Sequence, residues 1–372
     1  MGAQSGRHDP EASMNAEETQ TSPFVIPVVL FIFKRQDTLP RILGVLRQVR
    51  PTRVYVIADG ARIAEEVPAV EECRQVVERG ITWNCQIIKR YAVSNVGVYG
   101  NIGCGARWVL SREPSAIFLE DDNLPELTFF HYCEEMLKRY ATDERVLWIC
   151  GTNYLGKSAP KDGSSYMFTR HLLPCGWASW GEKFCQHYDG ELRALSVPGW
   201  RDRFARTFEN RGLYRQQRYL VERTKWILNT NKAAASWDYQ MAASIRMTGM
   251  YGIAPACNQI QNIGVDINST HGGNSFRYEM TRRLCGMDSF ALPVPLRHPP
   301  VVSVDANFEE RIGKIILYPW YLRSALLVGR ILKMLFGISK YASLTSVLKD
   351  RIRKLLQSST CRRAFTDESR IA

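Results

Sequence analysis

Three consecutive acidic residues, Glu120, Asp121 and Asp122, follow the apolar run AIFL at 116–119, which has the composition of a short buried strand. In an open α/β sheet, ligands gather at the carboxyl ends of such strands. Neighbouring carboxylates repel one another, and a cation that prefers oxygen ligands, Mg²⁺ or Mn²⁺, relieves the repulsion and can neutralise a diphosphate. Phosphatases and kinases also use acidic strand ends, and a solvated acidic turn has the same sequence, so the run alone leaves these alternatives open.

Five other residues carry groups that could serve such a site, and each also has a purely structural interpretation. Asp238 begins a predicted helix, where it could deprotonate a hydroxyl group or only cap the helix. His271 could be a metal ligand, contact a diphosphate, or only hold a Gly-rich loop. Arg35 follows the first predicted strand and could meet phosphate or lie exposed. Trp177 and Trp180 could stack on sugar rings or pack in the core.

Other common site chemistries find little support in the sequence. The Gly-rich segment 95–105 lacks the Gly-Lys-Ser/Thr ending of a phosphate-binding P-loop. The ten cysteines form no Cys-x-x-Cys pair and no Cys/His set with zinc-site spacing. They predict free, mostly buried thiols in a reducing cytoplasm.

Alternating apolar runs and amphipathic segments must position these residues. The apolar, β-branched runs predict strands and the segments with helical spacing predict helices, and the two kinds alternate from residue 26 to residue 150. The predicted strands are 26–33, 54–58, 86–91, 116–119 and 146–150, and the predicted helices are 38–49, 70–79, 97–111 and 127–139. This order predicts an α/β fold with an open, mostly parallel sheet and right-handed crossovers.

After residue 150 the alternation weakens. Helices are predicted at 202–228 and 236–248, and five tryptophans, Trp177 and Trp180 among them, are spread over expected loops and short helices. We expect 151–300 to pack on the sheet as the second half of the same catalytic unit.

The basic charge of the chain is concentrated near its C-terminus. The formal net charge is +12, and residues 311–372 contribute 13 Lys/Arg against 3 Asp/Glu, which leaves only +2 for the rest. This distribution gives little support to nucleic acid as a partner. After Pro299-Pro300, segments 312–336 and 346–356 predict basic amphipathic helices, and residues 311–357 are therefore a candidate for contact with an anionic membrane surface. The alternative is a helical pair packed on the catalytic domain.

The N-terminal residues 1–22 are polar and predict a disordered leader, and Met14 is an alternative start. They lack the apolar segment of a signal peptide. No run of apolar residues is long enough to predict a membrane-spanning helix. The expected location is the cytoplasm, and the basic tail adds the alternative of peripheral attachment to the inner face of the membrane.

The segment from Ala116 to Tyr154 resembles the core of the N-acetylglucosaminyltransferase I family and related bacterial nucleotide-diphospho-sugar transferases. In that family a strand ends in Glu-Asp-Asp, and a Phe-Phe helix, a Trp-containing strand and an Asn loop follow. The corresponding features here are 120–122, Phe129-Phe130, Trp148 and Asn153. The resemblance implies a GT-A-type fold, with a twisted, mostly parallel sheet flanked by helices and here a C-terminal basic amphipathic extension.

The resemblance continues in order over about 24–275. Residues 27–60 are similar to the family's first β-α-β unit, which holds the nucleotide base. Residues 175–180 are similar to its acceptor-side Gly-Trp segment, and Trp237-Asp238 is similar to the Trp-Asp pair that carries the catalytic base. The Asn-Ile-Gly at 262–264 with Thr270-His271 is similar to a stretch of the bacterial relatives.

The resemblance implies a role for each matching residue. Asp122 would coordinate the metal directly, with His271 as a further candidate, and Glu120 and Asp121 would contact the ribose or the donor sugar or act through water. Asp59 would lie near uracil or another base. Asp238 would deprotonate the acceptor hydroxyl and so cause inversion at the anomeric carbon.

The implied protein is an inverting, metal-dependent glycosyltransferase that uses Mn²⁺ or Mg²⁺. It would move a hexosyl or N-acetylhexosaminyl group from a nucleotide-diphospho-sugar, with UDP-sugar favoured, to a glycan or lipid-linked hydroxyl acceptor in bacterial surface polysaccharide or glycolipid assembly. The implied organisation is a leader at 1–22, a nucleotide-sugar-binding half at 23–150, an acceptor-side half at 151–300 and a basic helical tail at 301–372.

Two other functions stay open. The first is a sugar-nucleotide nucleotidylyltransferase, although residues 33–37 lack the glycines that such enzymes usually carry after the first strand. The second is a non-catalytic sugar- or membrane-binding protein on the same fold.

Overall fold

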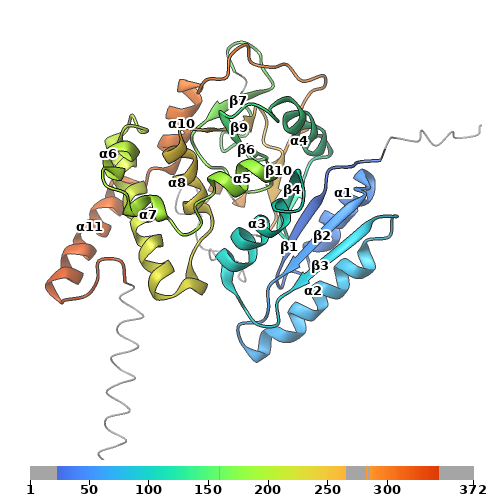
Figure 1. Cartoon of the computed structure of the whole chain (residues 1–372), viewed down its shortest axis with the longest axis horizontal. Coiled ribbons are helices and arrows are strands. Elements are labelled where there is room, and N and C mark those ends of the chain that lie inside the picture. Colours follow the sequence, from blue (N-terminus) through green and yellow to red (C-terminus); the bar gives the residue numbers. More distant parts are fainter. Residues whose placement is uncertain (1–22, 159, 265–281, 284, 343–372) are drawn as a thin grey trace, which may run out of the picture.

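The computed structural model describes residues 23–158, 160–264, 282–283 and 285–342 (Figure 1). The expectations for the leader 1–22, for His271 and for the helix at 346–356 lie outside these residues.

An eight-stranded sheet in the order β3-β2-β1-β4-β8-β6-β9-β7 forms the centre of the molecule (Figure 1). Six strands run in one direction, and β7 and β8 are antiparallel to their neighbours. The predicted α/β class with a mostly parallel sheet flanked by helices is confirmed. The strands are β1 (Val28–Ile32), β2 (Arg53–Ala58), β3 (Gln86–Tyr91), β4 (Ser115–Glu120), β6 (Val146–Cys150), β7 (Tyr166–Thr169), β8 (Trp177–Trp180) and β9 (Tyr251–Pro255).

The central strands are buried on both faces, which explains their continuous apolar sequences. Every residue of β1 and β6 is buried, as are the four central residues of β4. Such strands suit a sheet covered by helices on both sides, since side chains alternate between the two faces. β6, β7, β8 and β9 extend the same sheet, so the two expected halves of the catalytic unit share one core.

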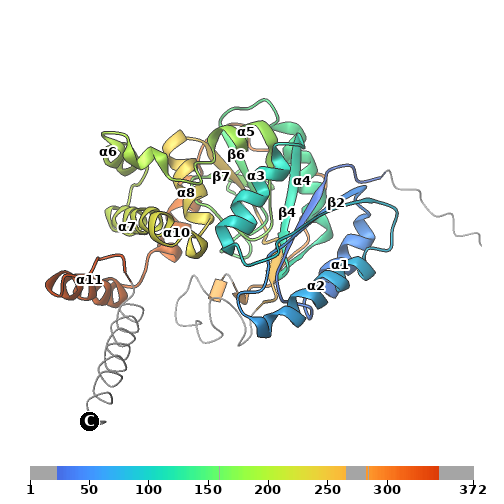
Figure 2. The ribbon, with the colours of Figure 1, turned by 60° about the horizontal axis from the view of Figure 1, so that its bottom comes forward.

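Helices cover the two faces of the sheet, as Figures 1 and 2 show. Trp180 in β8 donates its indole N–H to the carbonyl of Leu137 in α4, whereas Trp177 stacks on Phe184 in α5. These two tryptophans lie three positions apart in one strand and therefore point to opposite faces. One face carries α1 (Leu39–Val49), α2 (Val67–Gly80) and α4 (Leu127–Arg139), and the other carries α3 (Cys104–Leu110), α5 (Gly181–His187) and α8 (Asp238–Thr248).

Shorter elements complete the body. A π-helical turn at Tyr99–Gly103 precedes α3, and 3₁₀ turns lie at Ala64–Glu66, Arg193–Ser196 and Lys232–Ala234. β5 (Asn123–Pro125) pairs antiparallel with β10 (Ile260–Asn262) directly beyond the acidic run. The nine cysteines in the described part of the chain are free; four are buried and five are half-buried, so the prediction of mostly buried thiols holds only in part.

Three predictions about the chain after residue 150 were wrong in detail. The expected helix at 202–228 is divided into α6 (Trp200–Ala205) and α7 (Arg211–Thr230), because Asn210 caps α7 by accepting a hydrogen bond from Leu213 N at 3.0 Å. Trp177 and Trp180 begin and end a strand instead of lying in loops. The expected helix at 312–336 is likewise divided.

The basic tail begins as part of the body. α10 (Ala306–Ile316) buries Phe308 and Ile312, and the chain then bends before Pro319, which disfavours helix in the residue preceding it. α11 (Trp320–Leu335) follows and has no buried residue. Among the described residues no single helix is long and apolar enough to cross a membrane. The pair α10 and α11 passes that test together, with a bend of 55°.

A buried polar network attaches α10 to the body. Arg246 in α8 donates to Glu309 Oε1 and approaches His171 Nδ1, each at 3.2 Å, and His171 Nε2 lies 3.0 Å from the Glu309 carbonyl oxygen. Burial lowers the pKa of His171 to about 4, so the imidazole is neutral at neutral pH. Burial alone would raise the pKa of Glu309, but His171 and Arg246 outweigh it and lower the value. Because the imidazole is neutral there, Arg246 supplies the effective positive charge.

This network predicts a loss of stability in mild acid. Below pH 6.5 the unfolded chain protonates His171, whereas the folded protein resists protonation until about pH 4. The unfolded state then binds more protons, so the free energy of unfolding falls across that window, by about 3 kcal/mol for this group. In His171→Gln the decline between those pH values should be shallower in urea unfolding. His131→Gln, a change at an exposed histidine of α4, is the control and should keep the wild-type slope; equal slopes for all three proteins would refute the assignment.

Candidate functional site

The carboxyl ends of the parallel strands meet at one edge of the sheet, and the acidic run lies at the end of β4 on that edge. β1 and β2 end beside it, and the antiparallel β8 begins there, since Phe118 pairs with Trp177. The edge thus brings together segments that are far apart in the sequence, as expected for a site in an open α/β sheet.

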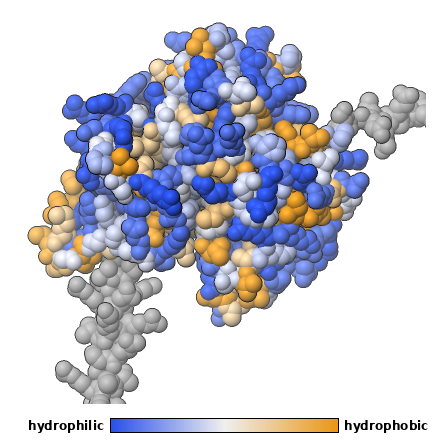
Figure 3. All heavy atoms as spheres, viewed as in Figure 1, coloured by the Kyte–Doolittle hydropathy of each residue, from blue (hydrophilic) through white to orange (hydrophobic). Residues whose placement is uncertain are grey.

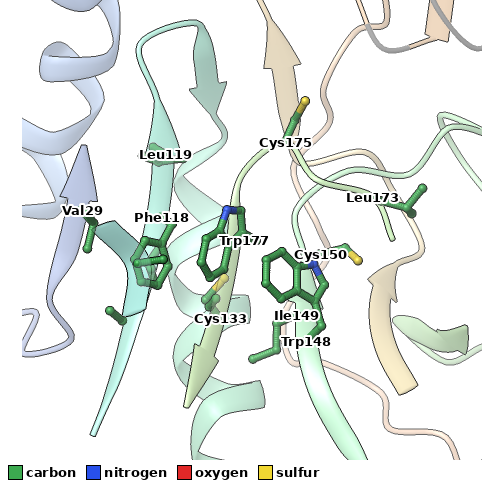
Figure 4. Close-up of a cluster of buried hydrophobic side chains, with 14 of the residues drawn as sticks. Val29, Phe118, Leu119, Cys133, Trp148, Ile149, Cys150, Leu173, Cys175 and Trp177 are labelled. Atoms are coloured by element: carbon green, nitrogen blue, oxygen red, sulfur yellow. The ribbon is translucent and has the colours of Figure 1, made fainter. Parts of the chain in front are cut away.

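A stack of aromatic rings beneath this edge connects β4 to the start of α8. Trp177 lies between Phe118 and Trp148, with ring centroids 3.8 and 4.1 Å apart and interplanar angles of 13° and 21° (Figure 4). Trp237 adds to the stack, 5.6 Å from Trp177. Since Asp238 follows Trp237, the stack sets the position of this carboxylate relative to the end of β4.

The stack also decides between the two interpretations of the tryptophans. Trp177 is 1% exposed and Trp180 is 6% exposed, and both belong to the core. The expectation that they stack on an acceptor sugar is therefore not supported, because neither ring is open to solvent in this arrangement.

Asp121 ties the end of β4 to the end of β1. Its Oδ2 accepts a hydrogen bond from Phe33 N at 2.8 Å, and its backbone carbonyl accepts one from the Thr38 hydroxyl at the start of α1. Burial and repulsion from Asp122 raise the pKa of Asp121 to about 7, although Phe33 N–H and Arg35 act in the opposite direction.

Two asparagines and a glycine surround Asp122. Asn123 donates to Asp122 Oδ1 at 2.6 Å and accepts from Gly176 N at 2.8 Å. The Asn262 side chain also hydrogen-bonds Asp122. Gly264 approaches so closely that a Cβ there would lie 2.6 Å from Asp122 Oδ2. The β5–β10 pairing holds this loop in place, so the orientation of Asp122 is closely determined.

Negative charge accumulates at this edge. Burial raises the pKa of Glu120 well above its usual value, and repulsion from Asp122, Asp121 and Asp238 raises it further. Burial also raises the pKa of Asp122, although Arg35 opposes the shift. The three side chains of the run are half-buried and keep some contact with solvent. A cation at this edge would therefore stabilise the ionised carboxylates.

The described residues do not form a closed metal cage. Within 23–158, 160–264, 282–283 and 285–342, no three His, Cys, Asp or Glu side chains form a group able to hold a metal ion. Asp121 is engaged with Phe33 N, and Asp122 is held by its asparagine neighbours. The donors present fit an ion of the Mg²⁺ or Mn²⁺ type that is bound by one or two carboxylates together with the phosphates of a substrate. Asp122 is the main candidate ligand, and His271 lies outside the described residues.

Asp238 lies at the site and also at a helix start. Trp237 occupies the N-cap position of α8, and Asp238 Oδ1 accepts a hydrogen bond from Tyr239 N at 2.9 Å. Repulsion from Asp238 contributes to the raised pKa of Glu120, after burial and after Asp122 and Asp121. The geometry is compatible with a base that faces the reacting groups, and that role stays a prediction.

Asp59 is buried, and its carboxylate organises a neighbouring loop. It accepts hydrogen bonds from the backbone N–H groups of Gly60, Val96 and Gly97 at 2.8, 2.8 and 3.1 Å and from the Asn95 side chain at 2.9 Å. Burial raises its pKa, and these N–H groups counteract the shift. With four donors on this carboxylate, Asp59 positions the 95–97 loop, and a direct contact with a nucleotide base stays a prediction.

Arg35 lies beside the acidic run. It donates to the Gly264 carbonyl oxygen at 2.8 Å and lowers the pKa of both Asp121 and Asp122. Its guanidinium therefore belongs to the site, and the expected contact with phosphate stays a prediction.

Sequence reasoning did not assign roles to the residues that orient Asp122. Asn123 is 1% exposed and bridges Asp122 to Gly176, 53 positions along the chain. Asn262 and Gly264 contact the same carboxylate from β10 and the loop that follows it. The sequence shows an asparagine directly after the acidic run and the Asn-Ile-Gly stretch at 262–264. Neither pattern indicates that these residues contact Asp122.

Comparisons with known proteins add little. No protein-family model matches the chain, and no curated protein matches it. Among solved structures it is similar to 4-diphosphocytidyl-2C-methyl-D-erythritol synthase from Anaerococcus prevotii, with a TM-score of 0.28 and 10% identity over 47% of this chain and 78% of that chain. It is also similar to mannosyltransferase PcManGT from Pyrobaculum calidifontis, solved with GDP-Man and Mn²⁺, with a TM-score of 0.31 and 11% identity over 59% and 68%. At these TM-scores neither likeness carries an argument.

The close approach of Gly264 to Asp122 makes a sharp prediction. In Gly264→Ala the new Cβ meets Asp122 Oδ2 at 2.6 Å, so the carboxylate must move. Binding of a UDP-sugar with Mn²⁺, measured by calorimetry, should weaken by about tenfold or more, since a 1.4 kcal/mol loss is tenfold. Gly44→Ala in α1 is the control, because nothing lies within 4 Å of its Cβ position. Undiminished binding in Gly264→Ala would show that the position of Asp122 is not critical.

Proposed function

We propose that this chain is a glycosyltransferase that moves a sugar from a nucleotide-diphospho-sugar to a hydroxyl acceptor. The observation that carries the proposal is the meeting of two acidic elements at the carboxyl edge of the sheet: the Glu120–Asp122 run at the end of β4 and Asp238 at the start of α8. The acidic run suits the charged leaving group and its cation, and Asp238 suits the acceptor hydroxyl.

The donor would lie over the ends of β1, β2 and β4. The β1–α1–β2 unit and the loop held by Asp59 supply a surface for the nucleotide. Arg35, which donates to the Gly264 carbonyl and acts on Asp122, would meet phosphate oxygens of the donor. A divalent ion such as Mg²⁺ or Mn²⁺, carried with the donor, would neutralise charge that develops on the departing diphosphate. The sequence resemblance favours a UDP-sugar, with Glu120 and Asp121 toward the ribose or the donor sugar.

The acceptor would approach from the side of α8. Its hydroxyl oxygen forms a bond to the anomeric carbon while the bond from that carbon to the diphosphate oxygen breaks. The hydroxyl proton passes to Asp238, and the nucleoside diphosphate leaves with the bonding electrons. A single displacement of this kind inverts the configuration at the anomeric carbon. The resemblance to bacterial relatives suggests a glycan or glycolipid acceptor in surface polysaccharide assembly.

Asp238→Asn tests the assignment of the base. Sugar transfer in the presence of Mn²⁺ should fall by about 10²- to 10⁴-fold, while the Kd for the donor changes little, because the residue acts on the acceptor. Asp202→Asn, a change at an exposed aspartate of α6, is the control and should leave turnover unchanged. Release of pyrophosphate from a nucleoside triphosphate plus a sugar phosphate would instead identify a nucleotidylyltransferase and overturn the proposal.

Asp122→Asn tests the cation-dependent side of the site. The nearly isosteric amide removes one of the repelling charges, so the melting temperature without ligand should stay equal or rise. The increase in melting temperature that Mn²⁺ and a UDP-sugar together cause in the wild type should disappear. A full ligand-induced increase in the variant, or one that persists with a chelator, would remove the cation from the proposal.

A further inference from the structure

α11 presents an apolar face that nothing in the described structure covers. Leu327, Ile331 and Leu335 recur at helical spacing and are 53%, 50% and 75% exposed, and Val328 beside them is 54% exposed. Trp320 and Tyr321 at the start of the helix are 72% and 51% exposed. Figure 3 shows a hydrophobic area over α11, at the lower left of the view. Exposed apolar residues gathered in this way mark an interaction surface.

The arginines of α11 lie along one border of this face, on the side toward α7, because Arg323 and Arg330 stand four positions before and three positions after Leu327. The Arg330 guanidinium lies 4.5 Å from the Tyr219 ring centroid, and Arg323 approaches Gly212. α11 contains three basic residues and no acidic residue, and the neighbouring α7 contains five basic residues and one acidic residue. A band of positive charge therefore borders the apolar face.

From these observations we infer that α11 docks on the surface of an anionic lipid bilayer. An apolar face bordered by Arg and Lys, with aromatic residues at one end, suits the boundary between headgroups and acyl chains. A second copy of the chain is a poorer occupant, because pairing two α11 helices would bring together two sets of like charges. The sequence around α11 is also free of negative charge, since no acidic residue occurs between Glu310 and Asp350.

The helix lies in the plane of the bilayer and does not span it. Its 16 residues reach about 24 Å, which is short of the hydrocarbon thickness of about 30 Å. α10 cannot lengthen the span, because Phe308 and Ile312 are buried in the body and Glu309 is held by Arg246.

Docking through α11 would bring the acceptor side of the site toward the bilayer. Tyr318, in the segment that joins α10 to α11, shares a hydrogen bond with Tyr239, the residue after Asp238. Resting on the proposed function, this continuity favours an acceptor hydroxyl on a lipid-linked molecule. The binding experiment below needs no turnover, so its outcome is independent of the proposed reaction.

The test is co-sedimentation of the full chain with vesicles. The wild type should bind vesicles of phosphatidylcholine and phosphatidylglycerol in equal parts, bind pure phosphatidylcholine far more weakly, and be released by high salt or alkaline carbonate. The double change Leu327→Ser and Ile331→Ser should weaken binding by at least about tenfold, because two large apolar side chains are lost from the interface. Arg330→Gln should weaken it by about fivefold.

Val93→Ser is the matched control, because Val93 is fully exposed on another part of the surface; its binding should equal that of the wild type. The inference is overturned if the wild type does not sediment with the anionic vesicles or binds both compositions equally. Resistance to carbonate would instead indicate a spanning segment. A wild-type dimer in light scattering that the double change makes monomeric, with vesicle binding unaffected, would identify a second copy as the occupant.

Discussion

Repulsion among carboxylates at the end of β4 is the constraint on which the site depends. Repulsion from Asp121, Asp122 and Asp238 raises the pKa of Glu120 at this half-buried edge, and Arg35 offsets part of the shift at Asp121 and Asp122. Such an arrangement opposes folding, since charges in a partly desolvated setting are costly without partners. The rest of the structure can hold it because the segment after β4 is anchored on both sides: Asp121 accepts from Phe33 N after β1, and Asn123 accepts from Gly176 N before β8. A site that destabilises its own fold in this way is typical of one that is completed by a ligand.

The aromatic stack provides the rigidity that this edge requires. Flat rings at van der Waals distance resist displacement, because the interior is close-packed and any shift opens a void. Trp177 is the centre of the stack: it contacts Phe118 of β4, Trp148 of β6 and Trp237 before α8. A core feature thereby sets the spacing between the acidic run and Asp238, which come from segments more than a hundred residues apart. The tryptophans contribute to the site by positioning charge, not by contacting a ligand.

Much of the first half of this fold is predictable from the sequence, because its signals are local. Apolar runs such as 26–33 are buried on both faces, and an acidic triplet after a strand lies at the ligand edge. The remainder depends on contacts that periodicity does not contain. Trp177 lies at the ligand end of the sheet because β8 pairs with β4. The helix expected at 202–228 is divided because Asn210 caps α7. Gly264 approaches Asp122 although the two residues are 142 positions apart in the sequence. Local patterns identify the chemical groups, and tertiary pairing decides their orientation.

The two helices of the tail, α10 and α11, look alike in the sequence but have different positions in the structure. α10 and α11 are both amphipathic, yet α10 carries two acidic and two basic residues and is held by a buried Arg246–Glu309 pair, whereas α11 is basic and buries nothing. Before Pro319, α10 packs against β7 and contacts Leu213 of α7. After Pro319, α11 contacts α7 through its arginines and leaves its apolar face exposed. An ion pair that is costly to bury adds little net stability but strongly penalises its own disruption. The Arg246–Glu309 pair therefore holds α10 on the body. α11 has no such buried contact, and its apolar face is exposed.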